Sequence, residues 1–204
     1  MIKAILFDYG GVLKNSHRLS DDIPAIYNIS KEDVAKAREF TAPIFDLFQK
    51  ELITEEDFWE KLSEAIKRPM PKDPGKFARE SYAKSLILYP EIFSFVKELR
   101  AKGFKVAVLS NIIKFQAEII RKNKGYEGFD EVVLSYEEKL AKPGIDIYLL
   151  TVNKLNVKPE ECIFIDDKEI NLMVARNLGM KTVLAGNPTQ VINDVSSILN
   201  SGNT

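Results

Sequence analysis

The fold is decided by the stretch Lys3-Ala-Ile-Leu-Phe-Asp-Tyr-Gly-Gly-Val-Leu13. A short apolar run, Ala4 to Phe7, ends in the acid Asp8, and two glycines follow before apolar residues resume. A nearly continuous hydrophobic run with a polar group at its carboxyl end is typical of a buried parallel strand. Because ligands of open α/β sheets lie at that end, Asp8 is a candidate functional residue. The alternative is an aspartate that merely starts a turn.

Length and charge narrow the classes of protein. The 204 residues suffice for one well-buried domain with a smaller insertion. Lysine plus arginine (29) nearly balance aspartate plus glutamate (30), so no basic excess predicts nucleic-acid binding. The single cysteine, Cys162, can form no internal disulfide, and no apolar stretch approaches the ~20 residues of a membrane span. With no signal-peptide pattern, we expect a cytoplasmic protein without nucleic-acid or membrane partners, and leave monomer or homodimer open.

From about residue 15 to residue 86 the pattern is helical. Ser30-Lys-Glu-Asp33 and Thr54-Glu-Glu-Asp57 resemble capping boxes. Apolar residues recur at helical spacing in one stretch: Phe40, Ile44, Phe45, Leu47 and Phe48. Such a stripe is more often the core face of a helix than the wall of a pocket, and both interpretations stay open. Prolines 69, 71 and 74 with Gly75 predict a loop before a further helix over 77–85.

After Leu88, strands and helices alternate. The expected strands cover 104–109, 131–134, 162–165 and 181–184, and the expected helices cover 90–102, 113–122, 145–155, 169–178 and 189–199. This alternation predicts an α/β fold, with a Rossmann-like parallel sheet and helices on both faces. We expect a core domain of 1–14 and 87–204, with a small α-helical cap domain, 15–86, inserted after the first strand. The tail, 200–204, is expected to fray.

Polar side chains end three of these strands: Asp8, then Ser110-Asn111, then Asp166-Asp167. The carboxyl ends of parallel strands lie on one edge of a sheet, so these groups should meet in one crevice. Lys142, in Leu-Ala-Lys-Pro-Gly, comes from a loop between the second and third of them. Taken singly, the pairs could be helix N-caps and the lysine a solvated side chain. The joint order and placement favour a site.

Aspartates that lie close together repel, so a cation must hold them. Carboxylates suit Mg²⁺, which commonly uses one or two protein carboxylates together with waters and substrate phosphate. A free aspartate can then attack phosphorus and form an aspartyl phosphate. Ser110, backbone N–H groups at a helix start and Lys142 would hold the phosphate oxygens. The constellation therefore predicts phosphoryl transfer, which depends mainly on positioning and charge stabilisation.

Four stretches resemble, in order, the motifs of the haloacid dehalogenase-like hydrolase superfamily: Phe7-Asp-Tyr-Gly-Gly-Val-Leu13, Leu109-Ser-Asn111, Ala141-Lys-Pro-Gly144 and Phe164-Ile-Asp-Asp167. The helical insertion is similar to the cap of the superfamily's first subgroup. Within it, residues 50–58 resemble a segment of α-glucose-1-phosphatase-type enzymes and of the N-terminal phosphatase domain of soluble epoxide hydrolases.

The resemblance implies a role for each matching residue. Asp8 would be the nucleophile and a magnesium ligand, and the backbone carbonyl of Gly10 would be a second ligand. Asp167 would be a direct ligand from the fourth motif, and Asp166 a ligand either directly or through water. Ser110 and Asn111 would bind the transferred phosphate, and Lys142 would orient the nucleophile and the phosphate.

One departure from the family pattern concerns proton transfer. Most phosphatases of this family carry a second aspartate, as general acid and base, where this chain has Gly10. His17, the only histidine, and Arg18 follow shortly and are candidate proton-transfer and anion contacts.

Three functions follow from this pattern. The leading one is a Mg²⁺-dependent phosphatase of a small phosphorylated metabolite, such as a sugar phosphate. Gly10 motivates the alternative of a non-catalytic or weakly active binding protein. A 2-haloacid dehalogenase is disfavoured, because Asp166-Asp167 would leave two uncompensated acids beside the nucleophile.

Overall fold

The computed structural model describes residues 1–201, and its centre is a parallel sheet of five strands in the order β3-β2-β1-β4-β5. The strands are β1 (Ala4–Phe7), β2 (Lys105–Ser110), β3 (Glu131–Leu134), β4 (Cys162–Asp166) and β5 (Lys181–Leu184). β1 lies in the middle, with Phe7 in register with Val108 on one side and Ile165 on the other. The predicted Rossmann-like α/β fold is confirmed, and the first strand of the sequence is its central strand.

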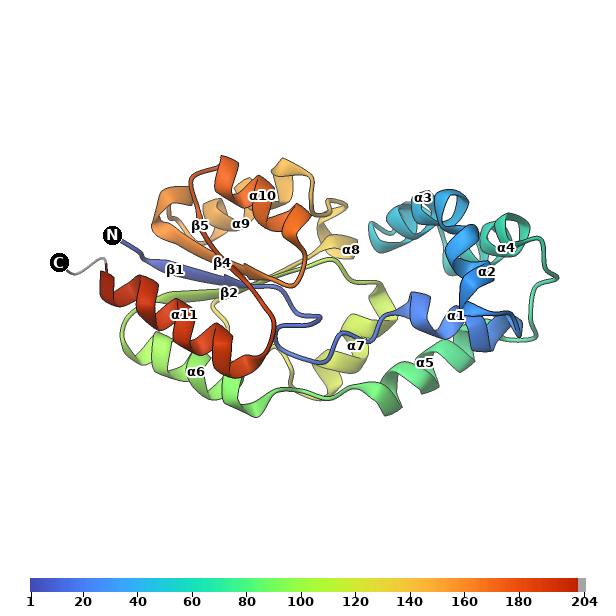
Figure 1. The fold of residues 1–204 in the computed structure, drawn as a ribbon, viewed down its shortest axis with the longest axis horizontal. Helices are drawn as coiled ribbons and strands as arrows, with labels where there is room; N and C mark the ends of the chain where they lie inside the picture. The colour runs from blue at the N-terminus through green and yellow to red at the C-terminus, as the bar shows by residue number, and fades with distance from the viewer. Residues whose placement is uncertain (202–204) are drawn as a thin grey trace.

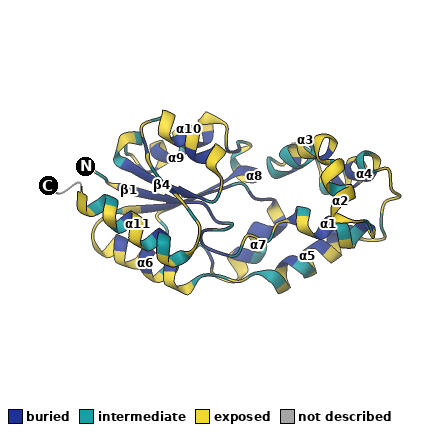
Figure 2. Ribbon diagram, in the orientation of Figure 1, coloured by how far each residue is buried: buried dark blue, intermediate teal, exposed yellow. Residues whose placement is uncertain are grey.

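Successive side chains of β1 point to opposite faces, and each face has its own core. Ala4 and Leu6 belong to one buried cluster, whereas Ile5 and Phe7 belong to another. The first cluster lies under α9 (Ile145–Lys154) and α10 (Glu169–Asn177), and the second under α6 (Pro90–Ala101), α7 (Lys114–Lys122) and α11 (Pro188–Ser201). Figure 1 shows these helices covering both faces, and the strands between them are buried in Figure 2. Two short elements complete this part: α8 (Ser135–Glu138) and the 3₁₀ turn η1 (Pro159–Glu161).

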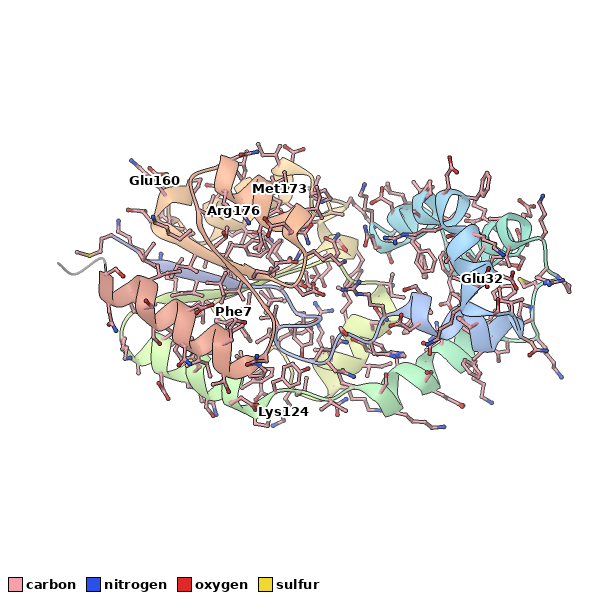
Figure 3. The ribbon with its side chains drawn as sticks, in the orientation of Figure 1. Phe7, Glu32, Lys124, Glu160, Met173 and Arg176 are labelled. Atoms are coloured by element: carbon pink, nitrogen blue, oxygen red, sulfur yellow. The ribbon has the colours of Figure 1, made fainter. Side chains whose placement is uncertain are left out.

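Residues 15–86 form helices beyond the carboxyl ends of the strands. They are α1 (Leu19–Tyr27), α2 (Lys31–Lys36), α3 (Arg38–Gln49), α4 (Glu55–Ile66) and α5 (Pro74–Ser85). They lie at the end of the molecule opposite the two termini in Figure 1, and Figure 3 labels Phe7 in the sheet and Glu32 on α2.

An aromatic cluster holds these helices together. Phe58 of α4 is fully buried, stacks on Phe48 of α3 at 4.2 Å between ring centroids, and meets Phe45 and Trp59 edge-on. Thr54 begins α4 with the expected capping box.

Three local expectations are wrong. Pro74 and Gly75 do not lie in a loop but form the first turn of α5, where proline needs no N–H partner and Asp73 caps the helix. Asn200 belongs to α11 rather than to a frayed tail, and the rest of that expectation, 202–204, lies outside the described residues. Phe40, placed in the apolar stripe, is 64% exposed and belongs to neither buried cluster.

The division into 1–14 with 87–204 and 15–86 stays a prediction, and we call 15–86 the insertion. One buried cluster runs without interruption from Phe7 in the sheet to Phe58 in the insertion. No helix among residues 1–201 combines the length and the apolar character needed to span a membrane.

Candidate active site

The sheet brings the predicted strand ends together. Asp8 follows β1 directly, and its backbone N–H donates to the carbonyl of Ile165 in β4 at 2.8 Å. Ser110 is the last residue of β2 and Asp166 the last of β4, the two strands that flank β1. Gly11 then turns the chain away with a positive φ of 84°, a conformation that glycine adopts without strain.

Lys142 joins two of the acids in a buried ion-pair cluster. Its Nζ lies 2.8 Å from Oδ1 of Asp8 and 2.6 Å from Oδ2 of Asp166, and its side chain is 1% exposed. Burial raises the pKa of Asp8 to about 6, against the lowering effect of the Lys142 charge. Burial alone would lower the pKa of Lys142, but the charges of Asp8 and Asp166 outweigh it and leave that pKa raised. Lys142 is therefore a fixed cation beside the predicted nucleophile.

Asp166 is positioned by the protein itself. One oxygen accepts from the backbone N–H of Lys168 at 2.8 Å, and Nδ2 of Asn171 lies 3.0 Å from both oxygens. With Lys142 on Oδ2, each oxygen already has a protein donor. A carboxylate held in this way is rigid before any ion or substrate binds.

The two carboxylate oxygens of Asp167 have different surroundings. Its Oδ2 accepts from Nη2 of Arg18 at 2.6 Å, whereas its Oδ1 is buried and has no hydrogen-bond partner among the described residues. A buried carboxylate oxygen without a partner calls for an ion or a water.

The three acids together fit a metal ion. Asp8, Asp166 and Asp167 each offer an oxygen within 4.8 Å of the others. An all-oxygen set suits Mg²⁺, so these residues fit the ion that the sequence predicted. Gly10 lines the cavity beside them, and the role expected for its carbonyl stays a prediction.

The structure gives Asn111 a positioning role. Its Nδ2 donates to the carbonyl of Lys142 at 2.7 Å, and its Oδ1 accepts from the backbone N–H of Lys142 at 2.8 Å. The amide thus clasps the loop that carries the buried lysine. The expected contact of Asn111 with phosphate stays a prediction, and its side chain is committed to this clasp. Ser110 is buried, with 2% exposure, but it lines the cavity. That position is compatible with the predicted contact with phosphate.

A cavity of about 640 Å³ lies between the strand ends and the insertion. Asp8, Ser110 and Lys142 line it on the side of the sheet, and Arg38 and Phe45 of α3 line it on the side of the insertion. The predicted apolar stripe therefore serves both purposes: Phe48 packs in the core, and Phe45 forms part of the cavity wall.

Sequence reasoning missed Lys14. This side chain lines the cavity although the residue is 3% exposed, and its Nζ donates to the carbonyls of Asn15 and His17 at 2.6 and 2.9 Å. Burial lowers its pKa to about 8, against the raising effect of Asp8. The only signal was its place directly after the first motif, since an isolated lysine is ordinarily a surface residue.

His17 and Arg18, the two candidate residues that follow the first motif, also line the cavity. Arg18 pairs with Asp167 as described. His17 contacts Asp22 of α1, with Nε2 3.2 Å from Oδ2. Asp22, 6% exposed, was not singled out in the sequence, because an aspartate in an amphipathic helix is ordinarily solvated.

Comparison with known proteins gives a family and several relatives. A family model of haloacid dehalogenase-like hydrolases matches residues 2–179. The chain is 28% identical over 207 residues to the mouse (Mus musculus) acyl-CoA dehydrogenase family member 10, covering 97% of this chain but only 19% of that protein. It is 25% identical over 210 residues to D-ribitol-5-phosphate phosphatase of Bacteroides thetaiotaomicron, covering 98% and 100% of the two chains.

Among solved structures, the fold is similar to that of a HAD family enzyme of Bacteroides thetaiotaomicron in complex with magnesium and inorganic phosphate. The TM-score is 0.71 at 28% identity, over 92% of this chain and 96% of that one. The similarity thus extends over the sheet and the insertion together.

Proposed function

This chain belongs to the haloacid dehalogenase-like hydrolases, and from that premise we propose that it is a Mg²⁺-dependent phosphatase of a small phosphorylated metabolite such as a sugar phosphate. The phosphatase relative and the magnesium and phosphate complex of a similar enzyme support the reaction class. A cavity of about 640 Å³ is the size of a small-molecule site.

One observation carries the proposal. The single charge of Lys142 is shared between the buried carboxyls of Asp8 and Asp166, while Asp167 keeps a buried oxygen without a hydrogen-bond partner among the described residues. A protein that needed only a stable core would gain little from burying charges, because desolvation offsets their attraction. The arrangement supports a site that is completed by a cation and a phosphate.

The chain's own residues would divide the work as follows. Asp8 attacks phosphorus and forms an aspartyl phosphate, which water then hydrolyses. Lys142 holds Asp8 in place and, with Ser110, offers positive charge and hydrogen bonds to the phosphate oxygens. Asp8, Asp166 and Asp167, with the carbonyl of Gly10, would hold Mg²⁺, which supplies positive charge to the transferred phosphoryl group. A cytoplasmic setting also stays a proposal and rests on the single buried and unpaired Cys162.

The test is release of inorganic phosphate from sugar phosphates, acyl phosphates and p-nitrophenyl phosphate, with Mg²⁺ and with chelator. We expect metal-dependent release that Asp8→Asn abolishes and that Asp194→Asn, an exposed acid on α11, leaves intact. Folded protein that releases no phosphate from any of these substrates would refute the proposal. If Mg²⁺ also fails to raise its melting temperature, the non-catalytic alternative gains support.

A further inference from the structure

The proposed reaction leaves one proton without a source. When Asp8 displaces an alcohol from phosphorus, the departing oxygen gains an electron pair and must be protonated, because an alkoxide is a poor leaving group. The position two residues after Asp8 is Gly10, which has no side chain to donate. The donor therefore has to come from another wall of the cavity.

Most other ionisable side chains of the cavity already hold partners. Lys14 and Lys142 are committed to carbonyls and carboxylates, Asp21 accepts from a backbone N–H at the start of α1, and Asp46 pairs with a lysine. Arg18 and Arg38 line the cavity too, but arginine does not release its proton in proteins. Lys31 and Lys168 also line it, but both residues are exposed, and no partner among residues 1–201 orients their amino groups. Burial raises the pKa of Tyr82 above its usual value, so its hydroxyl is a weak acid and a poor source of the proton.

His17 differs from all of these in how it is held. Its Nε2 lies 3.2 Å from Oδ2 of Asp22, and the other oxygen of Asp22 accepts from Oγ of Ser81 at 2.6 Å. Tyr82 packs beside the imidazole, with ring centroids 6.4 Å apart. Within residues 1–201 no hydrogen-bond partner occupies Nδ1. Orientation of an imidazole by a buried carboxylate is a feature of catalytic triads, and here Ser81 in turn holds that carboxylate.

The residues next to His17 contact the acids of the phosphate site. Arg18, the next residue, reaches Oδ2 of Asp167 at 2.6 Å. Lys14, whose Nζ holds the carbonyl of His17 at 2.9 Å, is close enough for the Asp8 charge to raise its pKa against the effect of burial. His17 and Asp8 line the same cavity, and the histidine side chain is 21% exposed. The imidazole is therefore ordered by the protein and open to a bound substrate.

We propose that His17 is the general acid and base of this enzyme, with Asp22 and Ser81 as its positioning residues; the inference rests on the proposed phosphatase activity. As Oδ of Asp8 bonds to phosphorus, the bond from phosphorus to the ester oxygen breaks, and that oxygen takes the proton from Nδ1 of the His17 imidazolium. The neutral imidazole then accepts a proton from the water that attacks the aspartyl phosphate. Asp8 leaves as a carboxylate, and the imidazolium is restored, so the net reaction is phosphate ester plus water to alcohol plus phosphate.

The experiment compares two substrates on each protein preparation. p-Nitrophenyl phosphate has a leaving group that departs without a proton, whereas glycerol phosphate releases an alcohol that needs one. The measured quantity is kcat/KM, which reports the steps through transfer of phosphorus to Asp8, and the ratio of the two values does not depend on the fraction of folded protein. The variants are His17→Gln, Asp22→Asn and, as a surface control, Lys36→Gln, whose side chain is 68% exposed.

In His17→Gln, kcat/KM for glycerol phosphate should fall about 10²–10⁴-fold, while the value for p-nitrophenyl phosphate should change less than about 10-fold. Asp22→Asn should shift the ratio in the same direction by a smaller factor, and Lys36→Gln should leave it unchanged. Equal losses on both substrates, an unchanged ratio, or a wild type that hydrolyses only the aryl phosphate would each overturn the role of His17. A folded wild type that hydrolyses neither substrate overturns the proposed function and this inference with it.

Discussion

Replacing Lys142 by methionine tests whether charge neutralisation is what Lys142 contributes. Methionine keeps most of the apolar stem but removes the ammonium group, which lies 2.8 Å from Asp8 and 2.6 Å from Asp166. Loss of one partner from a buried ion pair typically costs about 3–5 kcal/mol, because the remaining charge is left unpaired. At about 2–4 °C per kcal/mol for a chain of this size, the melting temperature should fall by about 6–20 °C at neutral pH.

The pH dependence identifies the cause of this loss. In the wild type, burial already raises the pKa of Asp8 to about 6, so between pH ~4 and about 6 this carboxyl binds more protons in the folded protein than in the unfolded chain. Stability contributed by such a group is present at low pH and is lost as pH rises through the folded pKa. Lys142 lowers the pKa of Asp8, so without it that pKa rises further and the loss extends to higher pH. The deficit of Lys142→Met should therefore be small near pH 5 and largest near pH 8.

Thermal unfolding at both pH values, with and without Mg²⁺, provides the measurement. Mg²⁺ should stabilise Lys142→Met more than the wild type, since it would be the remaining cation that can neutralise the acids. The control is Lys139→Met, because Lys139 pairs with Glu51 at 2.7 Å but is 46% exposed and should cost less than about 1 kcal/mol at either pH. A deficit of equal size at pH 5 and pH 8 would mean that packing of the lysine stem, and not its charge, explains the loss.

Two further substitutions test the Asp167 side of the site. In Gly11→Ala, the added Cβ would lie 3.0 Å from atoms of Asp167, so magnesium affinity measured by calorimetry should fall about 10-fold. The control is Gly103→Ala, because Gly103 also has a positive φ but an added Cβ there meets nothing within 4 Å. This control should lose about 1–2 kcal/mol of stability and keep its magnesium affinity. An equal magnesium affinity in the two variants would contradict this. Arg18→Ala removes the cation that holds Oδ2 of Asp167, so magnesium affinity should rise about 5-fold. Stability should change by less than about 1 kcal/mol, because the ion pair is partly exposed. Unchanged or weaker magnesium binding would argue against competition between Arg18 and Mg²⁺ for Asp167.

The sheet was predictable from the sequence because burial on both faces leaves a clear pattern. β1, β3 and β5 have the bounds that their apolar runs predicted, and the polar residues that end β1, β2 and β4 meet at one edge of the sheet. Parallel strands require this convergence, whichever residues occupy the ends. The position of the cavity between the sheet and the insertion could be predicted only in general terms. The spacing of apolar residues shows that a helix has an apolar face, but it does not show which element packs against that face.

The sequence showed which residue types are present near the site, but it could not show which hydrogen-bond partners they have or whether they are buried. Asn111 has the donor and acceptor groups of a phosphate contact and also those of a clasp on the Lys142 backbone, and only the fold shows the clasp. Lys14 and Asp22 were missed for a related reason, because lone charged residues are usually solvated and nothing local shows that they are buried. Lys14 is buried in the segment that follows β1, whereas Asp22 is buried where α1 contacts Ser81 of α5.

The position of His17 connects proton delivery to the insertion. An acid at position 10 would be carried by the turn after β1, and it would stay beside Asp8 wherever the insertion lay. His17 is instead fixed by Asp22 of α1 and packed against Tyr82 of α5, so its imidazole is in place only when both helices are. Any movement of α1 away from the sheet would withdraw the imidazole and, through the adjacent Arg18, its contact with Asp167. Hydrolysis of an alkyl phosphate would then require the insertion to be closed over the substrate, whereas a substrate with a good leaving group would be less sensitive to it, which couples recognition of the substrate to the chemical step.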